Sequence, residues 1–316
     1  MNPKVSICIP AYKQITLLRK VLESIRIQTF MDFELIITDD SPDKAVEVLL
    51  NEFDFNNKLK YMHNPVPLGS PANWNYGISI AKGKYIKILH TDDFFISDKS
   101  LEKYVELMEK NPQAYFGFSA SQVWSIATNE KQTFSCLPKQ LERIQTEPDL
   151  LFFRNVIGGP SAIIYRRDIN MEYDRNLKWL VDIDFYIRVL NHHRSVAYCN
   201  ESLICTTDGA EGQITQAVIN DKQIQIKEYS ILFNKLLESG TTIKKSRFSL
   251  FFKLLFNKFK VKSFSELASI IPVPAKQEVF YKKIISAVNR KMIFTRILVR
   301  LYNSSLNKRI FKMELF

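Results

Sequence analysis

Short apolar runs alternate with amphipathic helical patterns over the first 93 residues. Between the runs, apolar residues recur every three or four positions, as on one face of a helix. A strand, helix, strand, helix order predicts right-handed βαβ units, whose strands lie largely parallel in one sheet with helices on both faces. The runs expected to form strands are residues 5–9, 33–38, 59–62 and 85–89.

The residues that follow these strands are candidates for a functional site, because ligands of open α/β sheets bind beyond the carboxyl ends of the strands. They are Pro10, Ala11 and Tyr12 after the first strand, Asp39 and Asp40 after the second, and Asp92 and Asp93 after the fourth. Adjacent carboxylates repel each other unless a cation or hydrogen-bond donors satisfy them. The pattern therefore favours a binding edge over a purely structural one.

Asp92 and Asp93 suit a hard divalent cation, Mg²⁺ or Mn²⁺, which prefers oxygen ligands and often also binds substrate phosphates. Such a cation assists the departure of a diphosphate as a Lewis acid. His90 lies just before the pair and could reach the phosphates, but the sequence favours a role in filling the strand end. A structural alternative for the pair is a loop that caps the helix starting near residues 97–98.

Tyr12 and Asp40 suit a nucleobase, the ring by stacking and the carboxylate by accepting a hydrogen bond from a base N–H. A partly buried tyrosine at the start of a loop is the structural alternative for Tyr12.

The pattern changes after residue 97, as expected of an acceptor-binding half. A helix is expected from residue 101, strands over 115–123 and 161–165, and a polar, irregular loop over 124–146. Residues 181–190 predict a helix that opens with Asp182 and Asp184. Asp182 has apolar neighbours, which raise the pKa of a carboxyl towards the range of a general base. The alternative is a helix N-cap, a position that Asp favours. Asp184 is expected to support the helix start or to position the base.

Several segments, in order, closely resemble family 2 glycosyltransferases of GT-A fold, and together they span residues 4–215. The matching segments are residues 5–12 (VSICIPAY), 34–43 (ELIITDDSPD), 73–77 (NWNYG), 81–86 (AKGKYI), 89–93 (LHTDD), 159–162 (GPSA) and 181–188 (VDIDFYIR). The resemblance implies an inverting transfer of a sugar from a nucleotide-diphosphate donor to an acceptor hydroxyl. It divides the catalytic domain into a nucleotide-sugar half, residues 1–97, and an acceptor half, residues 98–215.

The resemblance also implies a role for each matching residue. Asp182 would be the catalytic base, and Asp92 and Asp93 would bind the divalent cation, Mn²⁺ or Mg²⁺. The nucleotide-binding residues would be Pro10, Ala11, Tyr12, Asp39, Asp40, Asn75 and Asp92. The candidate acceptor or phosphate contacts are His90, Asp184, Glu211 and Gln213, of which His90 stands where the family often has Asp. Glu211 and Gln213 lie where many relatives carry a His or Arg that touches the metal or phosphate.

Residues 216–316 are expected to form a basic helical extension. Residues 241–316 contain 17 Lys and Arg against 3 Asp and Glu, a net charge of 17 − 3 = +14, whereas the first 240 residues carry 27 − 30 = −3. Apolar residues recur among these cations at helical spacing, which predicts amphipathic helices that contact an anionic membrane surface. Packing of a helical subdomain on the body is the equal alternative. Nucleic acid is not expected as a partner, because the aromatic residues are mostly Phe in apolar clusters.

The remaining composition favours a cytoplasmic protein whose membrane attachment, where it occurs, is peripheral. There is no signal-peptide pattern and no apolar stretch long enough to span a bilayer. The four cysteines lack a C-x-x-C pair and are expected to be small buried side chains in a reducing compartment. By family analogy, the acceptor is expected to be a glycan or lipid-linked sugar of a bacterial surface polysaccharide, O-antigen or capsule. A nucleotide-sugar-binding scaffold without activity, held at the membrane by its basic tail, is the alternative function.

Overall fold

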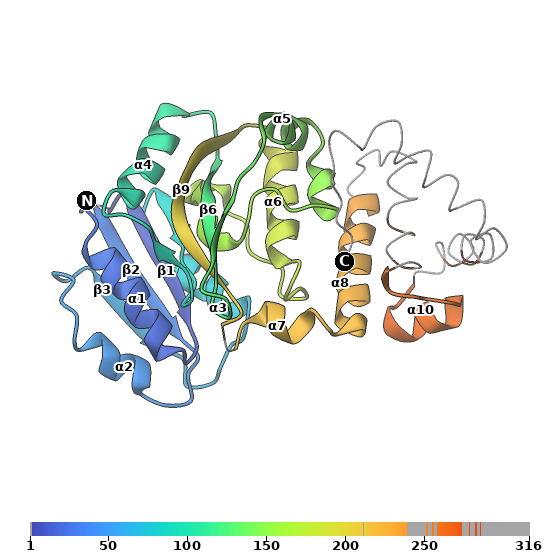
Figure 1. Cartoon of the computed structure of the whole chain (residues 1–316), viewed down its shortest axis with the longest axis horizontal. Helices are drawn as coiled ribbons and strands as arrows, with labels where there is room; N and C mark the ends of the chain where they lie inside the picture. The colour runs from blue at the N-terminus through green and yellow to red at the C-terminus, as the bar shows by residue number, and fades with distance from the viewer. Residues whose placement is uncertain are drawn as a thin grey trace.

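A nine-stranded sheet with helices on both faces forms the centre of the molecule (Figure 1). The computed structural model describes residues 2–210, 212–238 and 258–273 and the single residues 251, 255, 278, 282 and 285. The strands are β1 (Val5–Ala11), β2 (Phe33–Asp39), β3 (Leu59–His63), β4 (Tyr85–Ile88), β5 (Phe94–Phe95), β6 (Phe116–Ser125), β7 (Lys131–Phe134), β8 (Ile163–Arg166) and β9 (Val196–Asp208). Their order is β3-β2-β1-β4-β8-β6-β9-β5, and β7 pairs with β6.

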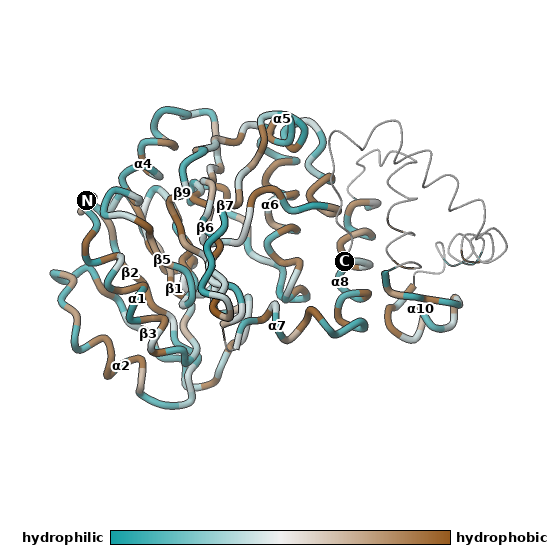
Figure 2. Tube along the Cα trace, in the orientation of Figure 1, coloured by the Kyte–Doolittle hydropathy of each residue, from teal (hydrophilic) through white to brown (hydrophobic). Residues whose placement is uncertain are grey.

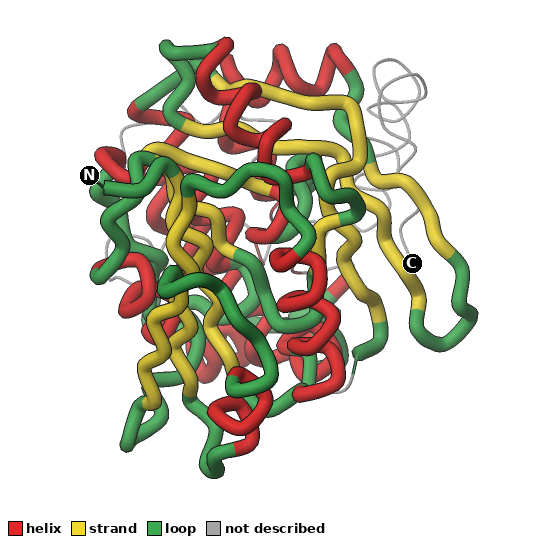
Figure 3. The backbone as a smooth tube through the Cα atoms, turned by 90° about the vertical axis from the view of Figure 1, so that its left-hand side faces the viewer, coloured by secondary structure: helices red, strands yellow, loops and turns green. Residues whose placement is uncertain are grey.

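The helices follow the expected positions in the first half and add several in the second (Figure 3). The α-helices are α1 (Ile15–Arg26), α2 (Ala45–Leu50), α3 (Ala72–Ser79), α4 (Ser100–Lys110), α5 (Pro138–Thr146), α6 (Val181–His192), α7 (Ile214–Val218), α8 (Lys222–Glu238) and α10 (Phe264–Ile270). Three 3-10 helices, η1 (Pro148–Phe152), η2 (Pro160–Ala162) and η3 (Arg167–Ile169), lie in the second half.

Strands β1, β2 and β4 are buried on both faces, where successive side chains point to opposite sides of the sheet, whereas the edge strand β3 is largely exposed. Ile7 and Ile9 of β1 pack in a cluster with α1, α2 and α4, whereas Cys8 packs in a second cluster with α3 and α6. Figure 2 shows the resulting apolar strands and helix faces. The expected strand–helix alternation is therefore confirmed for residues 5–88.

Strand β8 is antiparallel to β4, and this reversal shapes the second half of the sheet. Strands β1 to β4 are mutually parallel, as expected, but Tyr85 of β4 pairs with Arg166 at the end of β8. Strand β8 therefore begins at the edge of the sheet where β4 ends. This geometry places the segment 159–162, which precedes β8, beside the residues that follow β4.

The expectation of an irregular loop over residues 124–146 was wrong, because this segment contains β7 and α5. Strand β7 pairs its backbone with β6 at an edge and exposes most of its polar side chains, so it lacks an apolar alternation. Helix α5 buries only Gln140 and Ile144, and Gln140 Oε1 accepts the Leu137 N–H at its start. Strand β7 therefore carries no hydrophobic pattern from which it could be predicted, whereas α5 has an apolar face formed by Leu141 and Ile144 that the sequence analysis missed.

The described residues beyond α8 pack on the body of the protein. Phe251, Leu255 and Phe259 are buried, and the Phe251 ring stacks on Phe233 of α8 with centroids 3.9 Å apart. These contacts favour the packed helical alternative for this part of the tail. Most of residues 241–316, and with them most of the expected membrane surface, lie outside the described residues.

Two smaller expectations concern cysteines and membrane spans. Cys8, Cys136 and Cys205 are buried free thiols, whereas Cys199 is partly exposed. In the part of the chain that the structure describes, no helix has both the length and the apolar character needed to cross a bilayer.

Candidate active site

Strands β1, β2 and β4 end at one edge of the sheet, and the residues after them form the first wall of the candidate site. Ala11 at the end of β1 pairs with Asp39 at the end of β2, and the Asp40 N–H donates to the Ala11 carbonyl at 2.9 Å. The chain then turns away through Lys13 and Gln14, whose φ angles of 56° and 52° lie in the left-handed region. This turn leaves the Tyr12 ring 53% exposed at the edge.

Asp40 orders the loop that borders this wall. Its carboxylate accepts hydrogen bonds from the Asn64 side chain at 2.8 Å and from the backbone N–H groups of Leu68 and Gly69 at 3.0 and 2.8 Å. Asp40 is buried, so these donors replace the water that the charged group would otherwise bind. The loop 64–69 is thereby fixed next to Tyr12.

Asp39 is fully buried and is held by its own partners. It accepts the Ser41 N–H and the Tyr61 hydroxyl, each at 2.8 Å, and His63 Nδ1 lies 3.5 Å from it. Burial and the neighbouring Asp39 carboxylate raise the pKa of Tyr61 far above its usual value, so the hydroxyl remains a donor. Asp39 thus stabilises the end of β2 from the protein interior, whereas the Tyr12 ring faces solvent.

His90, Asp92 and Asp93 form a compact cluster after β4. One ligand atom from each residue lies within 4.8 Å of the others. Burial and the neighbouring Asp92 raise the pKa of Asp93 well above its usual value, and burial lowers the pKa of His90. The shift of Asp93 shows that the cluster holds its negative charge at a cost, and the shift of His90 favours a neutral imidazole, the form that binds metals.

The donor set fits a divalent cation. Two carboxylates supply the oxygen ligands that Mg²⁺ and Mn²⁺ prefer, and the imidazole supplies a nitrogen. His90 Nε2 is buried and has no hydrogen-bond partner among the described atoms, whereas buried polar groups are otherwise almost always paired. A cation beside Asp92 and Asp93 would give this nitrogen a partner.

Gln213 reaches the cluster from the loop after β9. Its Nε2 donates to Asp92 at 2.6 Å and to the Thr207 carbonyl at 2.8 Å, while its Oε1 accepts the N–H groups of Gly209 and Ala210. These bonds hold the loop 209–213 against Asp92. Glu211, the other candidate from this loop, lies outside the described residues.

Lys87 and Ser161 support the cluster from the interior. The Lys87 ammonium is fully buried on β4 and donates to the Ser161 carbonyl, and Ser161 Oγ accepts the His90 N–H at 3.0 Å. Burial lowers the pKa of Lys87 to about 7, while the negative charge of Asp93 acts in the opposite direction. The sequence signal for Lys87 was a lysine inside an otherwise apolar strand, and our sequence analysis missed it.

Asp182 lies in the first turn of α6, in surroundings that disfavour its charge. Burial raises the pKa of the carboxyl to about 7, although the Ile183 N–H donates to it at 2.8 Å. Asn155 Nδ2 lies 3.5 Å from the other carboxylate oxygen and also donates to the Gly158 carbonyl at 3.0 Å. The short segment 155–161 therefore connects Asp182 at one end with His90, through Ser161, at the other.

Asp184 and Asn75 are buried in structural contacts. Asp184 is 1% exposed and forms ion pairs with Arg188 and Lys235, each at 2.8 Å. Asn75 donates to the Tyr173 carbonyl at 2.8 Å and accepts the Tyr173 N–H at 2.9 Å, so it joins α3 to the segment before α6. Both side chains bind neighbouring parts of the fold.

Glu228 of α8 was not expected at the site. Its carboxylate accepts the backbone N–H groups of Lys178, Trp179 and Leu180 at 2.8–2.9 Å, immediately before α6. Its negative charge also contributes to the raised pKa of Asp182. No sequence pattern signals this role, because the contact joins two helices about 50 residues apart and uses only the backbone of one of them.

Comparisons with known proteins agree with this geometry. The model of the family described as glycosyl transferase family 2 matches residues 6–174, more than half of the chain. The chain therefore belongs to glycosyl transferase family 2.

Two similar relatives are described as uncharacterized glycosyltransferases. An uncharacterized glycosyltransferase of Haemophilus influenzae is 28% identical over 223 residues, which cover 69% of this chain and 73% of that protein. An uncharacterized glycosyltransferase of Methanocaldococcus jannaschii is 31% identical over 193 residues, which cover 60% of this chain and 65% of that protein.

Solved structures of S. aureus TarS share the fold. Residues 1–349 of TarS in complex with UDP-GlcNAc superpose with a TM-score of 0.59 at 16% identity, covering 87% of this chain and 77% of that one. The same protein in complex with UDP gives a TM-score of 0.55 at 14% identity, covering 88% and 78%. The expected GT-A fold is therefore confirmed.

Proposed function

We propose that this protein transfers a sugar from a nucleotide-diphosphate donor to an acceptor hydroxyl, with inversion at the anomeric carbon. The observation that carries the proposal is the arrangement along segment 155–161. One end of this segment contacts a carboxyl whose pKa is about 7, and the other end contacts the His90–Asp92–Asp93 cluster. Family membership and the UDP and UDP-GlcNAc complexes of TarS support a nucleotide-sugar donor.

The nucleotide occupies the edge formed by residues 10–12 and the loop 64–69. The exposed Tyr12 ring offers a stacking surface for the base. Asp40 fixes the loop, and its Oδ2, which accepts one hydrogen bond, keeps a lone pair that can accept from a base N–H. Asp39 and Asn75 contribute indirectly, by holding the end of β2 and the start of α3.

His90, Asp92 and Asp93 would hold the divalent cation beside the diphosphate of the donor. When bound, Mn²⁺ or Mg²⁺ neutralises the charge that develops on the departing nucleoside diphosphate. Gln213 keeps Asp92 oriented, and Ser161 with Lys87 keeps the backbone of His90 in place.

Asp182 acts as the general base. In its ionised form it accepts the proton of the acceptor hydroxyl, whose oxygen then bonds to the anomeric carbon as the bond to the diphosphate oxygen breaks. A single displacement of this kind inverts the configuration. The pKa of about 7 suits this task, because a base works best when its pKa lies near the operating pH.

The acceptor is proposed to be a glycan or lipid-linked sugar in the assembly of a bacterial surface polysaccharide. This part of the proposal rests on family analogy, since a fold supports many substrates. An anionic membrane would be contacted by the end of the chain: residues 286–316 contain seven Lys and Arg and one Glu, a net charge of 7 − 1 = +6. Removing these residues leaves the buried Phe251, Leu255 and Phe259 in place, so loss of binding to anionic liposomes would report the surface contact itself.

The central test is sugar-nucleotide turnover. The purified protein is incubated with Mn²⁺ and a panel of UDP-, GDP-, CDP- and dTDP-sugars, with and without glycan acceptors, and released nucleotide is measured. We expect the parent protein to release nucleotide and the Asp93→Asn variant to release none. Binding of a nucleotide sugar without any release would instead favour the inactive scaffold.

A further inference from the structure

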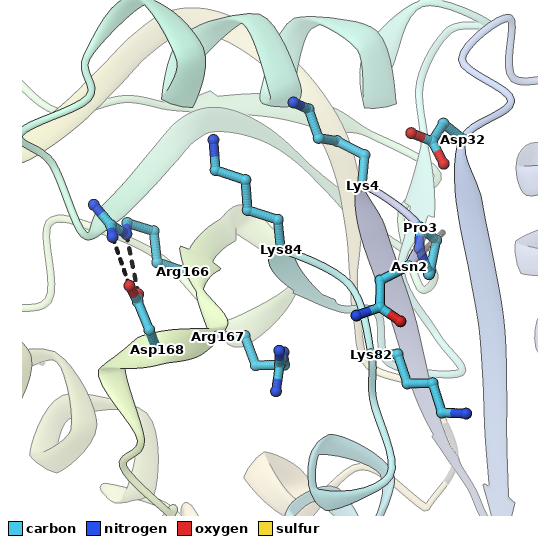
Figure 4. A pocket seen from close by; sticks show the side chains of 9 residues that line it. All are labelled: Asn2, Pro3, Lys4, Asp32, Lys82, Lys84, Arg166, Arg167 and Asp168. Carbon is cyan, nitrogen blue, oxygen red and sulfur yellow. Dashed lines mark hydrogen bonds and ion pairs between the residues drawn. The ribbon is translucent and has the colours of Figure 1, made fainter.

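A basic cavity lies at the edge of the sheet opposite the candidate active site. Its volume is about 520 Å³, and five of its lining residues are basic: Lys4, Lys82, Lys84, Arg166 and Arg167. These side chains come from the start of β1, the turn before β4 and the end of β8 (Figure 4). Nothing in the proposed transfer reaction uses them.

The topology separates this cavity from the active site by the length of the strands. Lys4 and Lys84 directly precede β1 and β4, whereas Tyr12 and His90 follow the same strands at their other ends. A seven-residue strand such as β1 is about 23 Å long. A ligand in the cavity and a nucleotide sugar therefore do not share contacts.

The backbone that carries the basic residues is held rigidly. The Gly83 N–H donates to Ser6 Oγ at 2.8 Å, and a Cβ on Gly83 would lie 2.5 Å from the Ser6 nitrogen, so the turn 82–84 lies directly against β1. The Arg167 N–H donates to the Lys84 carbonyl at 3.0 Å, and Arg167 Nε donates to the Gly83 carbonyl at 2.9 Å. These bonds hold the backbone of the turn 82–84 beside Arg167, whereas the Lys82 and Lys84 side chains extend from it in different directions (Figure 4).

The positive charge near the cavity is partly neutralised, since Asp32 and Asp168 also line it. Lys4 and Lys84 share one carboxylate, Glu109, at 3.3 and 2.7 Å, and Arg166 pairs with Asp168. Within the described residues, Lys82 and Arg167 have no ion-pair partner. Both are exposed at the cavity, so two cations remain available for an anion.

We propose that this cavity binds a phosphate group of a second ligand, distinct from the sugar donor. The guanidinium of Arg167 offers a fork of donors and Lys82 a point charge, the pair of groups that recognises a phosphate dianion. No aromatic residue lines the cavity, so the site lacks the stacking surface a nucleobase needs. The phosphate is carried either by a small free phosphate compound or by the headgroup of an anionic lipid.

Two probes distinguish these sources. Inorganic pyrophosphate, titrated calorimetrically in the presence of EDTA so that the divalent-cation site stays empty, tests the free compound. Vesicles of phosphatidylcholine with and without phosphatidylglycerol test the headgroup in a sedimentation assay. Both use the full chain and the variants Lys82→Glu and Arg167→Gln. Lys139→Glu and Lys139→Gln, which alter an exposed lysine of α5 and change the net charge as Lys82→Glu and Arg167→Gln do, are the matched controls.

We expect Lys82→Glu and Arg167→Gln to weaken binding of the relevant probe at least about tenfold, because a charge-assisted hydrogen bond is lost in each. Lys139→Glu should change it by less than about twofold, since screened charges far from the ligand contribute little. Melting curves verify that each variant is folded. Failure of both probes to bind the parent protein, or equal binding by Lys82→Glu and Lys139→Glu, overturns the proposal.

Discussion

The carboxylate of Glu228 accepts the backbone N–H of Leu180 at 2.8 Å, one residue before helix α6 begins. Together with the bonds to Lys178 and Trp179, this contact fixes the turn that leads to Asp182. Glu228 belongs to α8, beyond the part of the chain that the family model matches. A helix outside the family match therefore sets the position of the proposed base.

Glu228→Gln should destabilise the protein, because one of its two acceptor oxygens becomes an amide donor facing backbone N–H groups. We expect a loss of roughly 1–3 kcal/mol in the free energy of unfolding, the usual cost of leaving a buried polar group unpaired. Urea unfolding followed by circular dichroism measures it. Glu238→Gln changes an exposed position of the same helix and should leave the stability within about 0.5 kcal/mol; equal losses in the two variants would contradict the assigned role.

Asp182→Asn should abolish most transfer while leaving the fold intact. Loss of a general base lowers the rate by about 10²–10⁴-fold. Because burial raises the pKa of this carboxyl, its ionised form destabilises the folded state at pH 8, and a neutral amide removes that cost. The melting temperature at pH 8 should therefore not fall. Asp98→Asn, at an exposed carboxylate, is the control and should keep full activity; undiminished transfer by Asp182→Asn would refute the mechanism.

The pH dependence of kcat/KM should follow the ionisation of Asp182. The base acts in its deprotonated form, so the rate should rise with pH through an apparent pKa of about 7 and level off above it. Below that pKa, it should fall about tenfold per pH unit, as the fraction of ionised carboxyl does. Initial rates over this range, at saturating Mn²⁺, provide the measurement. A flat profile between about pH 6 and pH 8 would argue against Asp182 as the group that takes the proton.

Removal of either carboxylate after β4 should weaken divalent-cation binding. We expect Asp92→Asn and Asp93→Asn to lower the affinity for Mn²⁺ at least about tenfold, since a ligand contributes no less than the outer contacts that support it. Electron paramagnetic resonance of free Mn²⁺ reports this directly, without an activity assay. His90→Gln should have a smaller effect in the same direction. Wild-type affinity in both Asp variants would place the cation elsewhere.

Gly83→Ala should be strongly destabilising. Its new Cβ would lie 2.5 Å from the Ser6 nitrogen and 2.7 Å from the Val5 carbonyl carbon, and both are backbone atoms that cannot move aside cheaply. Overpacking of this kind costs about 1–3 kcal/mol or more. Gly159→Ala is the matched control, because nothing lies within 4 Å of its Cβ position. Thermal unfolding should show a clearly lower melting temperature for Gly83→Ala than for Gly159→Ala. Similar melting temperatures would show that the backbone of the 82–84 turn shifts to accommodate the added Cβ.

The first half of the fold could be predicted from the sequence because its signals are local. Strands β1, β2 and β4 are short and apolar, and α1 between the first two has a regular apolar face, so neither long-range pairing nor burial had to be known. The carboxylates after β2 and β4 could be placed at one edge by the same reasoning. Because β2 and β4 are parallel, Asp40 and Asp92, which follow them, must lie at the same edge of the sheet.

The second half could not be predicted in the same way, since its elements depend on tertiary contacts. The polar segment of β7 forms a strand only because it pairs with β6. No local sequence pattern indicates that β8 runs antiparallel to β4. The partners of Asp182 show the same limit. Its neighbour Asn155 comes from a turn and the supporting Glu228 from a distant helix, and only packing brings them together.

The antiparallel pairing of β8 with β4 has a practical consequence for engineering. Because β8 pairs with β4 and the short β5 pairs with β9, the two halves of the chain are interleaved in a single sheet. A chimera joined at residue 97 would separate β5 from its native partner and give β4 a foreign neighbour. Grafting a new acceptor preference onto this scaffold therefore calls for changes within loops, with the strands left as they are.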